Sequence, residues 1–207
     1  MKKYVLEVDL FDNPIGKVEK QAAHTSPVLH RAFSVFLYHD NKLLIQKRAK
    51  HKYHSGGLWA NTCCSHPQSN DIVSEAKERL FEEVGILQGD LKEIFCFTYF
   101  HQFDEHLYEY EYDHVLVGEF DGNYKINPDE VEELEWIDIE NLTIDLIKKP
   151  QIFAPWFLLA APKVIEYLKN QPNNCFLKYL KHSLKTFFPC GTTNTTLPTT
   201  LFASTGP

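Results

Sequence analysis

A thiol and an imidazole stand two positions apart near the middle of the chain, at Cys64 and His66. Pro67 disfavours a helix immediately before it, so an extended segment is expected here. In an extended segment residues i and i+2 point to one face, and Cys63 then points to the opposite face, into the core. One side chain of this pair can bind a metal while the other transfers a proton. The alternative is a small core cysteine beside a hydrogen-bonded histidine.

Two carboxylates on alternate residues are a second candidate for chemistry. Acids alternate with tyrosines between Leu107 and Phe120, so a strand would put Glu109 and Glu111 on one face and the rings on the other. Three histidines join these acids in a candidate ligand set: His24, His30, His66, Glu109 and Glu111. Imidazole with carboxylate suits Zn²⁺, Mn²⁺ or Fe²⁺. The alternative, a solvated face of an edge strand, is weakened by the tyrosines because their rings need burial.

Basic side chains on this acidic chain are a third candidate, for binding a phosphorylated substrate. The set is Lys20, Arg48, Lys52 and Arg79. An arginine fork matches the oxygens of a phosphate group. A solvated loop is the alternative, and it is favoured for the neighbouring Lys47 and Lys50.

Strands and helices must position these side chains. Strands are expected at Tyr4–Val8, Arg31–Tyr38, Lys42–Lys47, Ile94–Phe100 and Leu107–Phe120. Lys17–His24 reads as a polar segment leading into a loop, and Asn127–Glu135 as an acidic loop. The segment Phe153–Leu168 is expected to be mainly helical, with interruptions at Pro155 and Pro162.

Apolar residues recurring every four positions predict an amphipathic helix over residues 72–84, with Gly85 as its end. The last turns are similar to the end of the Nudix box, although Glu78 and Arg79 stand where Arg then Glu is expected. By the box spacing, Cys64 falls on the first Gly and Asn70 on the first Glu. An ordinary Nudix hydrolase needs those acids to activate water, so the departure argues against hydrolysis. The alternative is a surface helix with i,i+4 ion pairs.

Several separate motifs, in order, resemble the type I isopentenyl diphosphate isomerases. The resemblance covers residues 3–168 and rests on five segments: Glu19–His24, His30–Ser34, Trp59–Pro67, Tyr108–Glu111 and Ala154–Trp156. Ser65 departs from the pattern, since the family often has Gly there. The resemblance implies an α/β (α+β) chain with a Nudix fold, in which a mixed β-sheet is sandwiched between α-helices.

The resemblance also implies an enzyme, an isopentenyl-diphosphate delta-isomerase of isoprenoid biosynthesis. Such an enzyme interconverts isopentenyl diphosphate and dimethylallyl diphosphate by protonation and deprotonation through a tertiary carbocation. By resemblance Cys64 and Glu111 are the acid and base, with their order left open, and Tyr99 hydrogen-bonds in this group. Trp156 would face the cation, which a desolvated indole stabilises by about 2 kcal/mol or more. For Trp156 the alternative is core packing at a helix start.

Two metal sites follow from the same resemblance. The first divalent metal, Zn²⁺ or Mn²⁺, would be bound by His24, His30, His66, Glu109 and Glu111. Glu83 would bind Mg²⁺ shared with the substrate diphosphate, which Lys20, Arg48, Lys52 and Arg79 would help to neutralise. Two other functions stay open on the sequence alone: a Nudix hydrolase of a nucleoside or other diphosphate, and a non-catalytic metal-binding module.

Composition limits the cellular setting. The net charge of −7 disfavours a nucleic-acid binder, which needs a basic face. An odd number of cysteines without framework spacing (five) indicates reduced thiols and a cytoplasmic protein. No signal peptide is expected at the start, and the longest apolar run, residues 154–162, is too short to span a bilayer. We expect a small-molecule diphosphate as partner, with no membrane and no obligate protein partner.

The domain organisation is expected to be simple. Residues 1–170 should form the Nudix-like isomerase domain, and 171–207 a C-terminal extension. No charged side chain follows Lys185, and Thr, Pro and Gly dominate from there. The tail after residue 186 is therefore expected to be poorly packed.

Overall fold

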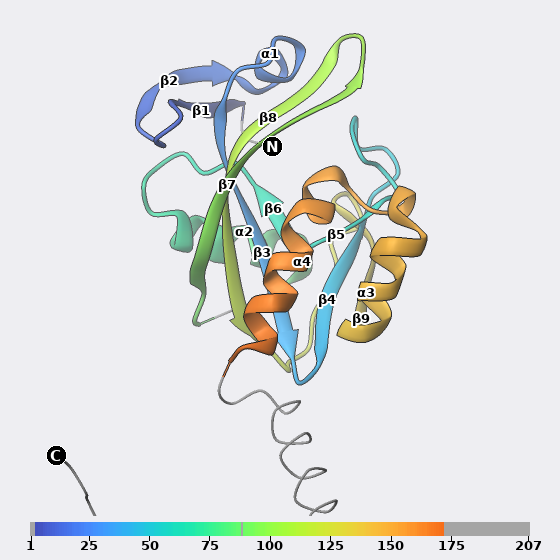
Figure 1. Ribbon diagram of the computed structural model, residues 1–207. Helices are drawn as coiled ribbons and strands as arrows, with labels where there is room; N and C mark the ends of the chain where they lie inside the picture. The colour runs from blue at the N-terminus through green and yellow to red at the C-terminus, as the bar shows by residue number, and fades with distance from the viewer. Residues whose placement is uncertain (1–2, 88, 172–207) are drawn as a thin grey trace, which may run out of the picture.

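One curled, mixed sheet of nine strands organises the described residues, 3–87 and 89–171 of the computed structural model (Figure 1). The strands are β1 (Tyr4–Val8), β2 (Pro14–Glu19), β3 (His30–His39), β4 (Lys42–Arg48), β5 (Trp59–Ala60), β6 (Cys63–Ser65), β7 (Lys92–Asp104), β8 (Leu107–Glu119) and β9 (Val131–Asp138). The helices are α1 (Lys20–Thr25), α2 (Ile72–Val84), α3 (Ile139–Lys148) and α4 (Pro155–Lys169), with a 3₁₀ turn at Pro150–Ile152. The predicted α+β class, with a mixed sheet between helices, is confirmed.

Strand β3 is the centre of the sheet and brings the distant motifs together. It pairs antiparallel with β4 and β6 and parallel with β8. The parallel register sets His30 opposite Glu111, and the antiparallel register of β7 with β8 sets Tyr99 opposite the same glutamate. Three segments far apart in sequence therefore meet at one end of the sheet, where β7 and β8 rise together toward α1 (Figure 1).

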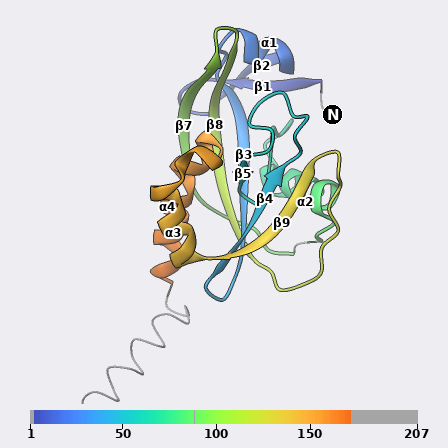
Figure 2. The ribbon, with the colours of Figure 1, turned by 90° about the vertical axis from the view of Figure 1, so that its right-hand side faces the viewer.

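Helices cover both faces of this sheet. Helix α2 lies on one face, and α3 and α4 lie on the other (Figure 2). Under α2, Ala76 and Leu80 pack with Phe33 and Leu37 of β3. Under α4, Phe157 packs on Phe36 with ring centroids 5.8 Å apart. Both faces of β3 are thus buried, which explains its nearly continuous apolar sequence.

Helix α2 has the ends that its sequence predicts. The Asp71 carboxylate accepts a hydrogen bond of 3.1 Å from the backbone N–H of Ser74. Gly85 ends the helix with a left-handed φ of 67° and donates its backbone N–H to the Phe81 carbonyl. A β-carbon at Gly85 would lie only 3.0 Å from the Lys125 carbonyl oxygen, so both conformation and space require glycine.

The polar segment before His24, for which no element was predicted, forms strand β2 and then helix α1. Two local expectations were wrong. The acidic stretch after Asn127 continues into strand β9, because Val131 and Leu134 are buried against β4 while the acids between them face outward. Helix α4 runs through Pro162, since the buried residues around it anchor both halves of the helix to the sheet.

The cysteines of the described part, Cys63, Cys64 and Cys96, are free thiols. Cys175, Cys190 and the tail predicted to be poorly packed lie outside the described residues. Within residues 3–87 and 89–171, no helix has both the length and the apolar character needed to cross a membrane.

Candidate active site

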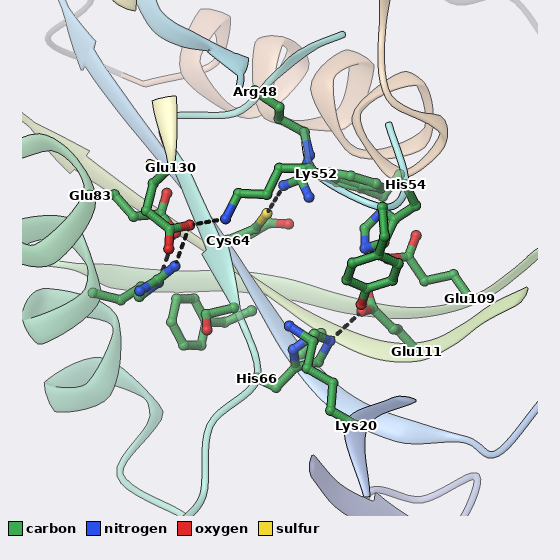
Figure 3. A pocket seen from close by; sticks show the side chains of 17 residues that line it. Lys20, Arg48, Lys52, His54, Cys64, His66, Glu83, Glu109, Glu111 and Glu130 are labelled. Atoms are coloured by element: carbon green, nitrogen blue, oxygen red, sulfur yellow. Dashed lines mark hydrogen bonds and ion pairs between the residues drawn. The ribbon is translucent and has the colours of Figure 1, made fainter. Parts of the chain in front are cut away.

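A polar pocket of about 60 Å³ opens at the end of the sheet where β3, β6 and β8 meet. It is lined by most of the predicted site residues: Lys20, Arg48, Lys52, Cys64, His66, Arg79, Glu83, Glu109, Glu111 and Trp156. The other three, His24, His30 and Tyr99, lie buried directly behind its wall. Figure 3 shows Cys64 between two groups, with Glu83 and Glu130 on one side and His66, Glu109 and Glu111 on the other.

The histidines are oriented by the backbone. His24 Nδ1 lies 2.6 Å from the Lys20 carbonyl oxygen, and His30 Nδ1 lies 2.8 Å from the carbonyl oxygen of Val28. A carbonyl only accepts, so each Nδ1 carries the hydrogen and each Nε2 presents a lone pair. Both Nε2 atoms are buried and have no hydrogen-bond partner. His66 Nε2 approaches Glu111 Oε1 at 2.8 Å.

This arrangement fits a divalent cation. The ligand atoms of His24, His30, His66 and Glu111 all lie within 4.8 Å of one another. Burial lowers the pKa of His24 to about 4 and the pKa of His66 to about 3, so both rings are neutral near pH 7. Neutral imidazoles with a second nitrogen fixed by hydrogen bonding are the form that binds metals. The buried, unpartnered Nε2 atoms are the observation that supports this fit.

Glu109 stands apart from that group. Its carboxylate belongs to a second group of potential ligands, formed with His24 and His54, that shares only His24 with the first. The two glutamates are joined through Tyr99, whose hydroxyl lies 2.6 Å from Glu111 Oε2 and 3.0 Å from Glu109 Oε2. The structure thus brings all five predicted ligands together, but in two overlapping sets.

The two glutamates differ in protonation. Burial, followed by the charge of Glu111, raises the pKa of Glu109 well above its usual value. Burial opposes ionisation of Glu111 as well, but the adjacent rings of His30 and His66 outweigh it and hold the pKa of Glu111 well below normal. The Tyr99 hydroxyl has one hydrogen, which it donates to the ionised Glu111. A neutral Glu109 carries a hydrogen of its own and can donate it to the Tyr99 oxygen, so all three oxygens are hydrogen-bonded.

The central segment has the predicted alternation. Cys63 is fully buried under α2, whereas Cys64 faces the pocket together with His66. Arg48 Nη1 lies 3.6 Å from Cys64 Sγ. Burial nevertheless exceeds the effect of this cation and raises the pKa of the Cys64 thiol to about 12. Cys64 is therefore a neutral thiol near pH 7, which is a proton donor.

The indole of Trp156 forms one wall beside this thiol. It is 3% exposed, and its Nε1–H donates to Asn61 Oδ1 at 3.0 Å. The buried Asn61 amide in turn donates to the Cys63 carbonyl oxygen at 2.6 Å. The Arg48 guanidinium lies 5.2 Å from the indole centroid, so the ring already faces a cation. Asn61 belongs to the sequence motif, but only the fold shows what it holds.

The opposite side of the pocket is a network of paired charges. Arg79 contacts Glu82 and Glu83 of its own helix and Glu130, the residue before β9, at 2.8, 2.7 and 2.8 Å. Lys52 also pairs with Glu130. Three carboxylates around one guanidinium leave excess negative charge, which fits a small hard cation such as Mg²⁺. Glu130 was missed because its segment was interpreted as a solvated acidic loop.

Comparison with known proteins places the pocket in context. Residues 28–157 match the NUDIX domain family. Isopentenyl-diphosphate Delta-isomerase 2 of Aromatoleum aromaticum is 43% identical over 167 residues, which cover 80% of this chain and 88% of that protein. The Isopentenyl-diphosphate Delta-isomerase of Pectobacterium atrosepticum is also 43% identical, over 79% of this chain and 92% of that protein.

Solved structures agree on the fold. The crystal structure of DR0079 from Deinococcus radiodurans superposes with a TM-score of 0.61 at 18% identity, covering 77% of this chain and 98% of that one. The MutT NUDIX hydrolase from Burkholderia pseudomallei gives 0.53, also at 18% identity, over 66% of this chain and 98% of that one. At this identity the likeness concerns the fold alone.

Proposed function

Because this chain belongs to the NUDIX family, and within it to the isopentenyl-diphosphate Delta-isomerases, we propose that it interconverts isopentenyl diphosphate and dimethylallyl diphosphate. One observation carries the proposal. A neutral thiol, Cys64, and an ionised carboxylate, Glu111, line the same pocket beside the indole of Trp156. The pocket therefore holds a proton donor, a proton acceptor and a surface that stabilises positive charge.

These groups match what moving a double bond requires. A proton added to the terminal alkene carbon forms a new C–H bond from the π electrons and leaves a tertiary carbocation. Loss of a proton from the carbon on the other side then returns an electron pair as the shifted double bond. Cys64 and Glu111 are the two proton-transfer groups, and each serves in both forms because the reaction is reversible. Tyr99 holds Glu111 in place through its 2.6 Å contact.

Trp156 stabilises the cationic intermediate. The indole is fixed by Asn61, and Arg48 lies over its face. A desolvated cation over an indole gains about 2 kcal/mol or more.

The first metal would be held by His24, His30, His66, Glu109 and Glu111, with Zn²⁺ or Mn²⁺ suited to this donor set. When bound, the ion orients the Glu111 carboxylate and sets its basicity. Mg²⁺ would be held at Glu83 and would neutralise the substrate diphosphate. Lys20, Arg48, Lys52 and Arg79 line the pocket around that position and would bind the remaining phosphate charge.

Hydrolysis of a diphosphate is the rival function, and one feature disfavours it. The box position for its first glutamate is Asn70, whose amide oxygen accepts from Arg31 Nη1 at 2.8 Å. This side chain is tied to β3 and carries no charge to hold a metal-activated water.

The setting of the enzyme follows from the same residues. We propose that residues 1–170 form the isomerase unit, because the family match ends inside α4. The free thiols of the described part, with Cys64 in the pocket, support a reducing compartment such as the cytoplasm.

The direct test is incubation of purified protein with isopentenyl diphosphate and Mg²⁺ under reducing conditions. Dimethylallyl diphosphate, measured by NMR or mass-resolved chromatography, is the expected product. Release of phosphate with no isomer would instead establish hydrolysis. Recovery of unchanged substrate by protein that holds its metal would establish a non-catalytic metal-binding module.

A further inference from the structure

A fourth histidine lies beside the metal-binding cluster and has no part in the proposed reaction. His54, in the loop between β4 and β5, is 8% exposed and lines the active-site pocket. Its Nε2 lies 3.3 Å from Glu109 Oε1. The other oxygen of the same carboxylate, Oε2, lies 3.0 Å from the Tyr99 hydroxyl. The two oxygens of Glu109 thus face two side chains from different segments. Figure 3 shows His54 beside Glu109.

His54 is fixed in position by aromatic packing. Its ring stacks on Phe103 at 5.4 Å and on His24 at 5.8 Å, and it meets the Trp156 indole edge-on at 5.9 Å. These three contacts come from β7, α1 and α4. Tilting the imidazole plane away from Glu109 would break these contacts, so the packing keeps one edge of the ring directed at the carboxylate.

Packing alone does not explain a histidine here. His54 Nδ1 is buried without a hydrogen-bond partner, and leaving a buried polar atom unpaired destabilises a protein. A phenylalanine would fill the same space between Phe103 and His24 without that penalty. The contact of a ring nitrogen with Glu109 is therefore what histidine provides at position 54 and phenylalanine would not.

His54 is also poorly placed to be an inner ligand of the same ion. His54 groups with His24 and Glu109, but not with His30, His66 or Glu111. His24 offers only Nε2, because its Nδ1 is bonded to the Lys20 carbonyl, so it can bind one ion at a time. The two overlapping groups therefore describe one ion, and four of the five predicted ligands lie in the group that does not contain His54.

We propose that His54 is a positioning residue of the metal centre: it donates its Nε2–H to Glu109 and aims that carboxylate at the ion. This inference rests on the proposed function, since it takes Glu109 as a ligand. Groups that orient a ligand in this way typically contribute about 10–100-fold to metal affinity. His54 would tighten metal binding without contacting metal or substrate.

The test compares Mn²⁺ affinities of chelator-stripped protein by titration of the free-ion EPR signal. His54→Phe keeps the ring packing and removes the donor, and it should weaken Mn²⁺ binding about 10–100-fold. His54→Gln keeps an N–H toward Glu109 and should stay within about threefold of wild type. His51→Gln, on an exposed neighbour in the same loop, is the matched control and should bind as wild type does. At saturating Mn²⁺, His54→Phe should recover most of its kcat.

Three outcomes would overturn the inference. Mn²⁺ bound by His54→Phe as tightly as by wild type would show that the contact orients nothing. Equal losses in His54→Phe and His54→Gln would show that the N–H is not what matters. If wild-type protein binds no Mn²⁺, the metal centre itself is wrong and the inference fails with it. This outcome is distinguishable from the first two, in which the metal site exists but His54 does not orient Glu109.

Discussion

The hydroxyl of Tyr99 offers the cleanest perturbation of the proton-transfer groups. Tyr99→Phe removes one oxygen from a side chain that is 5% exposed and stacked on Phe97 at 5.6 Å. The ring can stay where it is, so the sheet should keep its packing. The change leaves Glu111 Oε2 without its 2.6 Å partner and Glu109 Oε2 without its 3.0 Å partner.

The magnitude follows from the stronger of these contacts. A hydrogen bond to a charged group contributes roughly 1.5–3 kcal/mol. Since about 1.4 kcal/mol is a factor of ten in rate, kcat should fall about 10- to 150-fold if the bond acts on Glu111 during proton transfer. KM for isopentenyl diphosphate should change little, because the Tyr99 hydroxyl bonds to Glu109 and Glu111 rather than to a phosphate-binding side chain.

Steady-state isomerisation at fixed Mg²⁺ measures both constants, and Tyr110→Phe is the matched control. Tyr110 lies next to Glu111 but on the outer face of β8, away from the pocket. Denaturant unfolding of both variants checks that the fold is kept. The reasoning would be refuted if Tyr99→Phe kept its kcat within about twofold, or if Tyr110→Phe lost as much.

Three further predictions test other parts of the site. Cys64→Ser should lose about 10²–10⁴-fold in turnover while still binding substrate, whereas Cys63→Ser should cost only stability; normal turnover in Cys64→Ser would contradict the assignment. Arg48→Ala should raise KM more than it lowers kcat, and a large fall in kcat at constant KM would count against a phosphate-binding role. Metal-free protein should lose stability as the pH falls from about 6.5 to about 4. In this range His24 is protonated in the unfolded chain but stays neutral in the folded protein, where burial lowers its pKa to about 4. His24→Asn should remove about 3 kcal/mol of this pH-dependent loss in denaturant unfolding, and an identical pH dependence would disprove it.

Local patterns were enough to predict the groups that share a strand. The i, i+2 relation of Cys64 to His66, and the separation of Cys63 from both, follow from backbone alternation and are confirmed. The acids and tyrosines of β8 behave in the same way, with Glu109 and Glu111 buried toward the pocket.

Contacts between elements far apart in the sequence could not be predicted from local patterns. Asn61, His54 and Glu130 each act through a residue from another element: Trp156, Glu109 and Arg79. No spacing in the sequence links these pairs, because each joins segments that are far apart along the chain. The bridge of Trp59 to Phe153 lies beside Asn61 and Trp156, and the pairing of β4 with β9 brings Glu130 to the pocket. Strand β9 was missed for the same reason, since its burial comes from β4.

The most direct test of proton transfer is isomerisation in D₂O. Purified protein with Mg²⁺ and isopentenyl diphosphate should yield dimethylallyl diphosphate with deuterium in a methyl group, seen by ²H and ¹H NMR, and with the diphosphate intact by ³¹P NMR. Glu111→Gln should abolish this labelling. Product without methyl deuterium, or labelling that persists in both Cys64→Ser and Glu111→Gln, would contradict proton transfer by these two residues.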